Sequence, residues 1–272
     1  MTTRTSTVTE PAVRTVQGVR VPALGLGTWQ LEGRACQEAV ETALAIGYRH
    51  LDTAQLYGNE AAVGAGIAAS GLDPAELFVT TKIASGEKTP AQVRASTEAS
   101  LERLGLERVD LLLLHQPVAD RPLAQALAEM AAMVAEGRVG GLGVSNFPLD
   151  LLEEAMAAVP LLAIQLEYHP MRAQDRQLAA ARRHDLLFQA YSPLARGRAV
   201  DDAAVAGVAE RLEATPAQVV LRWLLDQPPV APIPKASSRR HLEENWAAQA
   251  VVLDDEARAT LDALRGGERR GP

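Results

Sequence analysis

Four polar side chains stand where short apolar segments of the chain end, and together they could do acid–base chemistry. Asp52 and Tyr57 follow RHL, Lys82 closes LFVTTK and His115 closes VDLLLLH. Apolar runs of this length, bounded by turn residues, are typical of buried parallel strands. In a closed parallel barrel the carboxyl ends of all strands open onto one face, where catalytic residues gather. We therefore expect a carboxylate, a phenol, an ammonium and an imidazole to meet in one pocket.

Such a cluster could protonate a carbonyl oxygen at neutral pH. The pKa of a free tyrosine is about 10, and a nearby lysine ammonium lowers it, so Lys82 should make Tyr57 a better acid. A buried Lys82 stays charged only with a carboxylate partner, which gives Asp52 its role. A neutral His115 can donate a hydrogen bond to a carbonyl oxygen. We expect these groups to stabilise the alkoxide that forms when a hydride reaches a carbonyl carbon.

Each residue taken alone also has an ordinary structural explanation. Asp52 could be a helix cap, Tyr57 a half-buried aromatic, and His115 a structural residue beside a core strand. Lys82 is less ordinary, because lysine is rarely buried without a partner. The joint placement of all four at strand ends favours a functional site.

The elements that must position these residues alternate along the chain. VRTVQGVRVP predicts a hairpin turning at Gln17 and Gly18, and a first strand follows at 24–27. Seven more apolar runs follow, each with a helix or a loop and helix. The expected helices are 59–70, one starting after 89–90, 122–136, 149–158, 173–184, 202–213, 216–225, 239–245 and one starting near 254.

Eight strand–helix units predict a parallel sheet with right-handed crossovers. The 272 residues suit a single closed barrel, for which about 250 are typical. We therefore expect an α/β fold: a (β/α)8 TIM barrel with a short N-terminal β-hairpin and extra C-terminal helices. An open doubly wound sheet is the alternative, but none of the glycine clusters has the G-x-G-x-x-G spacing of a dinucleotide-binding turn. Residues 1–12 are expected to be a flexible leader and 13–272 a single barrel domain.

Composition narrows the class of protein further. The net charge of -7 is spread along the chain and no basic stripe appears, so we expect no nucleic-acid partner. No run approaches 18 apolar residues and no signal-peptide core is present, so we expect no membrane partner and a cytoplasmic location. The single cysteine, Cys36, suits a reducing compartment. The five histidines show no close ligand pair, so we expect no metal. We also expect a monomer.

Eight ordered stretches carry a family resemblance. They are LGLGTWQL, GYRHLDTAQLYGNE, FVTTKI, LLLLHQP, GVSNF, IQLEYHP, AYSPLARG and PIPKASSRRHLEEN. In these stretches, which run from about residue 20 to residue 246, the chain resembles the aldo-keto reductase family, including bacterial 2,5-diketo-D-gluconic acid reductases. The resemblance implies a barrel that binds a nicotinamide cofactor without a Rossmann domain and reduces aldehydes or ketones to alcohols.

The resemblance also implies roles for individual residues. Tyr57 becomes the proton donor, tuned by Lys82 and Asp52, and His115 orients the carbonyl of a small-molecule substrate. The expected cofactor-binding residues are Thr28, Ser145, Asn146, Gln165, Tyr191, Ser192, Pro193, Leu194, Lys235, Ala236, Ser237, Ser238, His241, Glu244 and Asn245. Among them, Ser145, Asn146 and Gln165 match positions that hydrogen-bond the nicotinamide carboxamide, and Tyr191 matches the aromatic that stacks on its ring. The expected substrate-binding residues are Trp29, Tyr57, His115 and Gln116.

Two departures from the family pattern should shape the protein's own preferences. Lys235 is kept, but Ala236 and His241 replace the serine and arginine common in relatives that prefer NADPH. An imidazole cannot bind a phosphate bidentately, so we expect NADPH to be preferred over NADH by a narrower margin. Gln116 replaces a tryptophan that often walls the pocket. With the short loop 116–121 and the short C-terminus, this predicts an open and more polar site.

Two other functions remain open from the residues alone. Lys82 could be a Schiff-base nucleophile, although an Asp52 partner would hold it protonated. The chain could also be a non-catalytic, nicotinamide-binding barrel that senses redox state, although such a protein need not keep all four polar groups.

Overall fold

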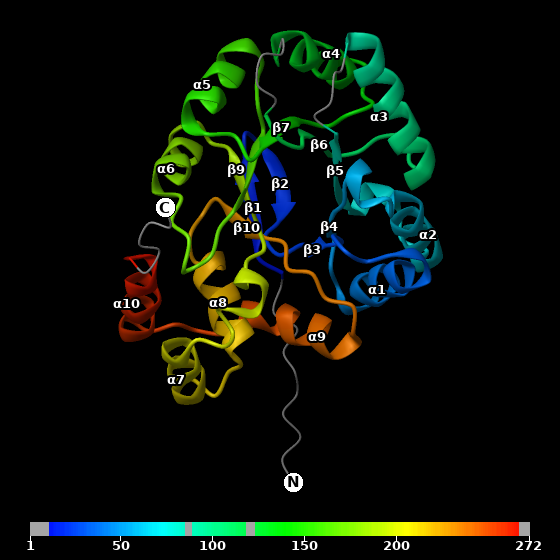
Figure 1. The fold of residues 1–272 in the computed structure, drawn as a ribbon. Coiled ribbons are helices and arrows are strands. Elements are labelled where there is room, and N and C mark those ends of the chain that lie inside the picture. The colour runs from blue at the N-terminus through cyan, green and yellow to red at the C-terminus, as the bar shows by residue number, and fades with distance from the viewer. Residues whose placement is uncertain (1–10, 85–88, 118–122, 267–272) are drawn as a thin grey trace.

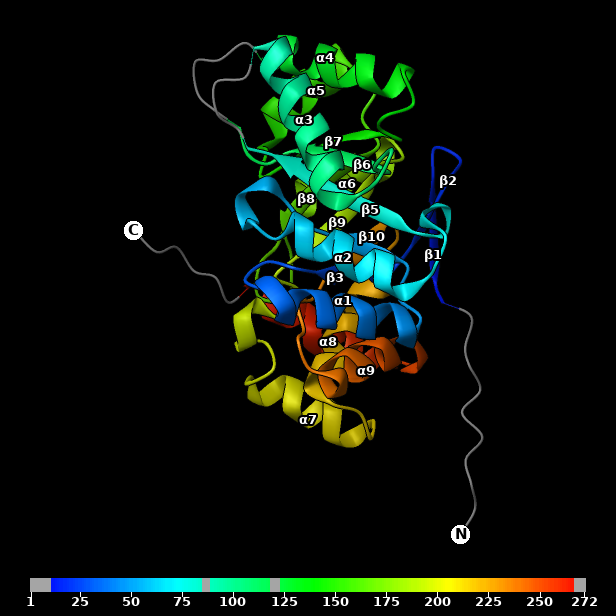
Figure 2. The same cartoon turned by 90° about the vertical axis from the view of Figure 1, so that its right-hand side faces the viewer.

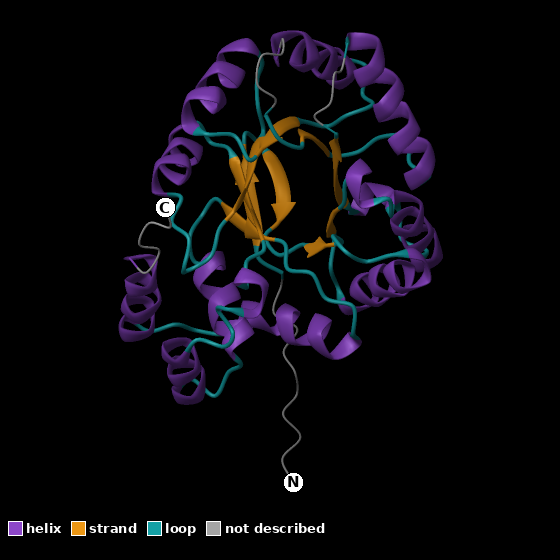
Figure 3. Cartoon of the chain, in the orientation of Figure 1, coloured by secondary structure: helices purple, strands orange, loops and turns teal. Residues whose placement is uncertain are grey.

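Eight parallel strands form a ring at the centre of the molecule, and the helices lie outside it (Figure 1, Figure 3). This computed structural model describes residues 11–84, 89–117 and 123–266. The strands are β3 (Leu26–Gly27), β4 (His50–Asp52), β5 (Phe78–Ile83), β6 (Leu111–Leu114), β7 (Leu142–Ser145), β8 (Ala163–Glu167), β9 (Leu187–Tyr191) and β10 (Val230–Pro232). They pair in chain order, each parallel to the next. The expected (β/α)8 barrel is confirmed.

The first and last strands close the ring through backbone hydrogen bonds. The amide of Gly25 donates to the carbonyl of Pro232, and the amide of Gly27 donates to that of Pro234, both at 3.0 Å. Only glycine fits this seam at position 27, because a Cβ there would lie 2.6 Å from the carbonyl oxygen of Ile233. The close approach of these two segments therefore depends on a missing side chain.

The helices cover the outer faces of the strands. They are α1 (Gly33–Ile46), α2 (Glu60–Ser70), α3 (Pro90–Leu104), α4 (Leu123–Ala135), α5 (Leu149–Ala158), α6 (Asp175–Arg183), α7 (Ala203–Arg211), α8 (Pro216–Leu225), α9 (Arg239–Ala247) and α10 (Asp255–Ala263). Short 3-10 turns are η1 (Gln55–Tyr57), η2 (Pro74–Glu76), η3 (Ala195–Gly197), η4 (Ala248–Ala250) and η5 (Leu264–Gly266). Among the described residues, no helix is both long and apolar enough to cross a bilayer.

Local sequence explains where several helices begin and end. Thr89 and Thr215 each form a capping box with the glutamine three residues on, and proline follows each threonine. Asn59, expected inside α2, instead precedes it, because its side chain binds the carbonyls of Thr28 and Leu31. The helix expected over 202–213 ends at Arg211, and Glu213 takes a positive φ of 52°. Residue 122, expected to start α4, and residues 1–10 of the expected leader lie outside the described residues.

The expected hairpin is present and closes the amino end of the barrel. Its strands are β1 (Val13–Val16) and β2 (Val19–Pro22), and both turn residues have positive φ, as a tight two-residue turn requires. The hairpin lies to one side of the ring in Figure 2. It packs on the first residues of the strands in one apolar cluster, formed by Val16, Val21, Phe78, Leu111, Leu113, Leu162, Ala163, Leu187 and Ala231.

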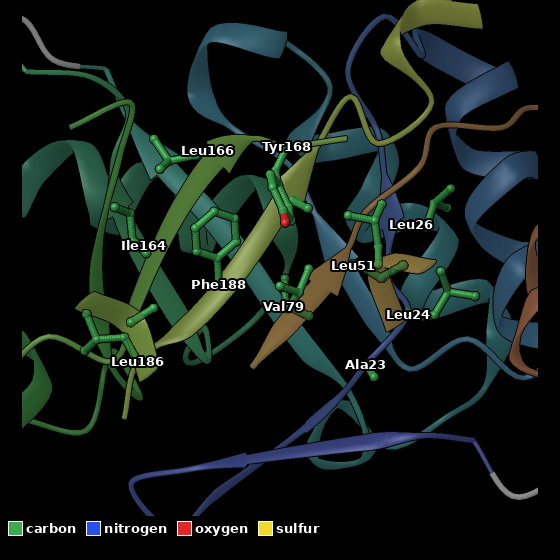
Figure 4. Packing of buried hydrophobic residues seen from close by; sticks show 14 of the residues in the cluster. Ala23, Leu24, Leu26, Leu51, Val79, Ile164, Leu166, Tyr168, Leu186 and Phe188 are labelled. Carbon is green, nitrogen blue, oxygen red and sulfur yellow. The ribbon is translucent and has the colours of Figure 1, made fainter. Parts of the chain in front are cut away.

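A second, larger apolar cluster fills the space between the strands and the helices. Figure 4 shows part of it, including Val79, Ile164 and Phe188. The run Leu111–Leu114 supplies both clusters: Leu111 and Leu113 face the barrel interior, whereas Leu112 and Leu114 face the helices. Strands buried on both faces therefore read as continuous apolar sequence.

Candidate active site

The inward-facing residues of the strands change from apolar to polar between the two ends of the barrel. Successive inward positions are two residues apart, and along β5 they read Phe78, Thr80, Lys82. Along β9 the series ends in Gln189 and Tyr191. The polar ends surround one pocket at the carboxyl end of the barrel. It is lined by Gly27, Trp29, Asp52, Tyr57, His115, Ser145, Asn146, Gln165, Tyr191, Ser192, Arg196, Ile233 and Lys235.

Lys82 is the buried centre of the four-residue cluster. Its ammonium donates to Asp52 Oδ1 at 2.6 Å, to the Thr53 carbonyl at 2.9 Å and to the Tyr57 hydroxyl at 3.1 Å. These bonds use all three N–H groups of a side chain that is fully buried. Burial alone would lower the pKa of Lys82, but the attraction of Asp52 and Tyr57 raises it above its usual value. Lys82 is therefore held as a cation.

Tyr57 reaches the cluster from η1, the turn that follows β4. We expected Lys82 to lower its pKa, and the ammonium does act in that direction. The net pKa of Tyr57 is nevertheless raised, because burial outweighs the ammonium and the Asp52 carboxylate adds to the effect of burial. The phenol therefore holds its proton at neutral pH, as a proton donor must.

His115 follows β6 directly and faces Tyr57. The two ring centroids are 5.7 Å apart, with the planes at 80°. Burial, and next the charge of Lys82, lower the pKa of His115 to about 4. The imidazole is therefore neutral at pH 7. Its Nδ1 is buried and has no partner among the described residues, which leaves Nε2 as the nitrogen that can reach a ligand.

Asn146 connects several residues of the pocket lining. It has a positive φ of 63°, a conformation that asparagine tolerates better than most residues. Its amide nitrogen donates to the His115 carbonyl at 3.0 Å and to Ser145 Oγ at 3.1 Å, and its Oδ1 accepts from the Tyr191 hydroxyl at 2.8 Å. Asn146 thus fixes three site residues, and the Ser145 hydroxyl keeps its own proton to donate.

Gln165 completes a donor–acceptor pair with Ser145. Its amide nitrogen donates to Asp52 Oδ2 at 2.7 Å and to Gln189 Oε1 at 2.9 Å, so only its carbonyl oxygen is left for the pocket. A primary carboxamide needs one donor for its oxygen and one acceptor for its amine. Ser145 and Gln165 offer that pair beside the ring of Tyr191, so the residues fit a nicotinamide group.

The rim of the pocket contains residues that the sequence analysis missed. Arg196 lies with its guanidinium 5.3 Å from the ring of Trp29, whose surface is 42% exposed. Its loop is strained, with positive φ at Ser192, Ala195 and Arg196. The position of Arg196 two residues after Leu194 could have indicated that it lies at the pocket, because Ser192, Pro193 and Leu194 were already expected to bind the cofactor.

Some predicted residues lie away from the pocket lining. Thr28 is buried behind the rim, where its hydroxyl donates to the Asp52 carbonyl. Gln116 is exposed and is not one of the lining residues, and most of the loop after it (118–122) lies outside the described residues. The others outside the lining are Lys82, Pro193, Leu194, Ala236, Ser237, Ser238, His241, Glu244 and Asn245.

Most of the predicted residues outside the lining lie in α9 or in the segment just before it, 235–238. Ser238 caps α9 and accepts from the His241 amide, while Lys235, Ser237 and His241 are exposed. Ala236 and Asn245 are buried. In the described part of the chain, no group of three or more His, Cys, Asp or Glu side chains is placed to hold a metal ion.

The fold and the site together define a (β/α)8-barrel enzyme with an acid–base cluster at the carboxyl ends of its strands. The sequence model of the aldo/keto reductase family matches residues 23–265. The chain belongs to this family of oxidoreductases, which act on small carbonyl substrates.

Individual relatives agree with that assignment. The chain is 38% identical to methylglyoxal reductase DkgB of Escherichia coli O157:H7 over 257 residues, covering 92% of this chain and 95% of that protein. It is similar to the crystal structure of a putative 2,5-diketo-D-gluconic acid reductase B, with a TM-score of 0.90 and 36% identity over 96% of this chain and 95% of the other. It also resembles the aldo-keto reductase of Bombyx mori in complex with NADP (TM-score 0.87, 27% identity, 96% and 95% coverage).

Proposed function

We propose that this protein is an NADPH-dependent reductase of aldehydes and ketones. One observation carries the proposal: a single buried ammonium binds both the Asp52 carboxylate and the Tyr57 hydroxyl, next to a neutral His115. The pairing of Ser145 with Gln165 supports nicotinamide binding in the same pocket. Non-catalytic cofactor binding would require none of the Lys82 contacts.

The four residues divide the work of carbonyl reduction. A nicotinamide cofactor held by Ser145, Gln165 and Tyr191 would supply the hydride for the carbonyl carbon. His115 donates a hydrogen bond to the carbonyl oxygen and orients it toward Tyr57. The Tyr57 O–H bond breaks as its proton moves to that oxygen, which forms the alcohol. Lys82 then stabilises the phenolate, and Asp52 keeps the ammonium charged until solvent returns the proton.

The structure disfavours a Schiff-base role for Lys82. A nucleophilic lysine needs a neutral amine and therefore a lowered pKa. Here the pKa of Lys82 is raised, and all its N–H groups are engaged by Asp52, Thr53 and Tyr57.

The preference for NADPH is supported by positive charge near the start of α9. Lys235, Arg239 and Arg240 are exposed there, and Arg239 pairs with Glu243 at 3.2 Å. A 2′-phosphate would be attracted by these charges and by the amino end of the helix.

We place the enzyme in the cytoplasm, acting as a monomer on small, moderately polar carbonyl compounds.

Consumption of NADPH with methylglyoxal, a nitrobenzaldehyde and a keto-sugar acid tests this function, since relatives are named for substrates of the first and last kinds. Tyr57→Phe should lower kcat by about 10²-fold or more, because the proton donor is lost, while the Kd for NADPH stays within about twofold. Tyr48→Phe is the matched control, since Tyr48 is a buried tyrosine whose hydroxyl binds the Leu242 carbonyl away from the pocket. Full activity in Tyr57→Phe would refute the assignment of the proton donor.

A further inference from the structure

A continuous chain of buried polar groups runs from the pocket down the barrel interior to the hairpin. It contains Asp52, Gln165, Gln189, His50 and the carbonyl of Pro22. The four residues are each at most 2% exposed. Polar groups at this depth are costly unless they are hydrogen-bonded, so a connected chain inside the barrel calls for an explanation. The acid–base chemistry proposed above involves neither Gln189 nor His50.

The groups at the two ends of this hydrogen-bonded series determine which atoms in it donate and which accept. At the hairpin, the Pro22 carbonyl can only accept, so His50 Nδ1, 2.9 Å away, carries the ring proton. The other ring nitrogen of His50 must then accept, and it lies 2.8 Å from Gln189 Nε2. The second N–H of that amide donates to Thr80 Oγ1 at 3.0 Å. Gln189 therefore turns its carbonyl oxygen toward Gln165.

The same order continues to the pocket. Gln165 donates one N–H to the oxygen of Gln189 and the other to the carboxylate of Asp52, which can only accept. A flip of the Gln165 amide would set oxygen against oxygen at both contacts. A flip of Gln189 would set its amine against that of Gln165 and its oxygen against the bare nitrogen of His50. Both amides thus have one satisfied orientation.

We propose that Gln189, backed by His50, is a positioning residue that holds Gln165 with its carbonyl oxygen toward the carboxamide amine of the bound cofactor. This inference rests on the proposed function, because it assumes that nicotinamide occupies the pocket. Gln189 touches neither the cofactor nor the substrate. The carbonyl oxygen of Gln189 accepts from the Gln165 amine. This contact makes the flipped orientation of Gln165, in which the amine would face the pocket, unfavourable.

A cofactor analogue isolates this contact. In the 3-acetylpyridine analogue of NADP+, a methyl group replaces the carboxamide amine, so the analogue cannot donate to Gln165. Binding of NADP+ and of the analogue is measured by quenching of tryptophan fluorescence, for which Trp29 lies in the pocket lining. We expect the wild type to prefer NADP+ by about five- to tenfold, the value of one hydrogen bond. Gln165→Leu, which removes the acceptor, should bring the ratio close to one.

Gln189→Leu is the decisive variant, because it keeps the volume of the side chain and removes its hydrogen bonds. The preference for NADP+ should fall at least about threefold. Gln189→Glu keeps an acceptor facing Gln165 and should retain the preference. Thr97→Val is the matched control for loss of a buried polar group, since Thr97 is fully buried and its hydroxyl donates to the Val93 carbonyl of its own helix. It should leave the ratio unchanged.

The outcomes separate this inference from the proposed function. A folded Gln189→Leu protein with the wild-type ratio overturns the inference and leaves carbonyl reduction intact. A wild type that binds no NADP+ overturns both. Where Gln189→Leu does not fold, His50→Phe tests the chain from its other end, because it removes the acceptor that orients Gln189. That variant should also lower the ratio, and an unchanged ratio contradicts the proposal.

Discussion

Tyr57 and His115 are both neutral at pH 7, but for different reasons. Tyr57 keeps its proton because burial opposes the phenolate more strongly than Lys82 favours it. His115 stays unprotonated because burial opposes the imidazolium and Lys82 repels it. The ammonium therefore acts on its two neighbours in the same direction, toward loss of a proton. Burial separates them by favouring the uncharged form of each.

The pKa of His115 predicts how carbonyl reduction depends on acid. Because that pKa is about 4, the neutral form persists from pH 7 to about pH 5, and kcat/KM should stay nearly constant over that range. It should fall as the pH approaches 4, where the imidazolium forms beside Lys82. Initial rates at saturating NADPH test this, with circular dichroism at each pH to exclude unfolding. A midpoint near 6.5 would show that His115 titrates as an ordinary exposed histidine.

At the scale of elements, α9 and the segment before it are where the proposed cofactor would place its adenosine end. The Ser238 oxygen caps the helix by accepting from the His241 amide and keeps its own proton to donate, whereas Ala236 is buried and has no polar side-chain atom, so of these two side chains only Ser238 can bind a phosphate. His241 lies in the first turn of α9 with its side chain exposed. The positive charge near this helix start comes from Lys235, Arg239 and Arg240.

Restoring an arginine in that first turn should sharpen cofactor choice. We expect His241→Arg to raise the ratio of kcat/KM for NADPH over NADH by about tenfold, because a guanidinium binds a phosphate through two charge-assisted hydrogen bonds. Both ratios come from steady-state rates with one aldehyde. His184→Arg, the same change at the exposed end of α6, is the control and should have no effect. An unchanged ratio in His241→Arg would place the 2′-phosphate away from this turn.

At the scale of the whole molecule, the buried polar chain ties stability to pH. His50 is fully buried, and burial lowers its pKa to about 4, against a partial opposing effect from the Pro22 carbonyl and Asp52. The ring also meets the edge of Phe78 and the amide of Gln189. Below pH 6.5 the unfolded chain binds a proton at this histidine before the folded chain does. The contribution is therefore fully present above pH 6.5 and is lost as the pH falls toward 4.

Replacing His50 should make the free energy of unfolding depend less on pH below pH 7. At pH 5 protonation of the unfolded state at His50 costs roughly 2 kcal/mol of folding free energy. His50→Asn should be less stable than the wild type at pH 7 but should lose less further stability between pH 7 and pH 5. Urea denaturation at pH 7 and at pH 5 gives the unfolding free energy of each protein, and the difference between the two pH values is the quantity compared. His184→Asn, at an exposed site, should lose as much stability between the two pH values as the wild type. An equal loss in His50→Asn would contradict the role given to His50 in acid destabilisation.

Local sequence determined the elements of this protein. The run Leu111–Leu114 is apolar because both of its faces are buried, and Thr-Pro pairs begin α3 and α8 because capping depends on residues three apart. The polar residues Asp52, Lys82 and His115 were identifiable because each ends one of these apolar runs. Gln189 and Arg196 were missed, although Gln189 shares a strand face with Tyr191.

Only the tertiary structure decided how those residues act on one another. The net pKa of Tyr57 depends on a balance between burial and charges from β4 and β5. The orientation of Gln165 depends on Asp52, 113 positions away, and on Gln189. The same geometry buries Thr28 behind the rim and leaves Gln116 outside the lining. Electrostatics and hydrogen bonding act through space, so they are fixed only when the barrel closes.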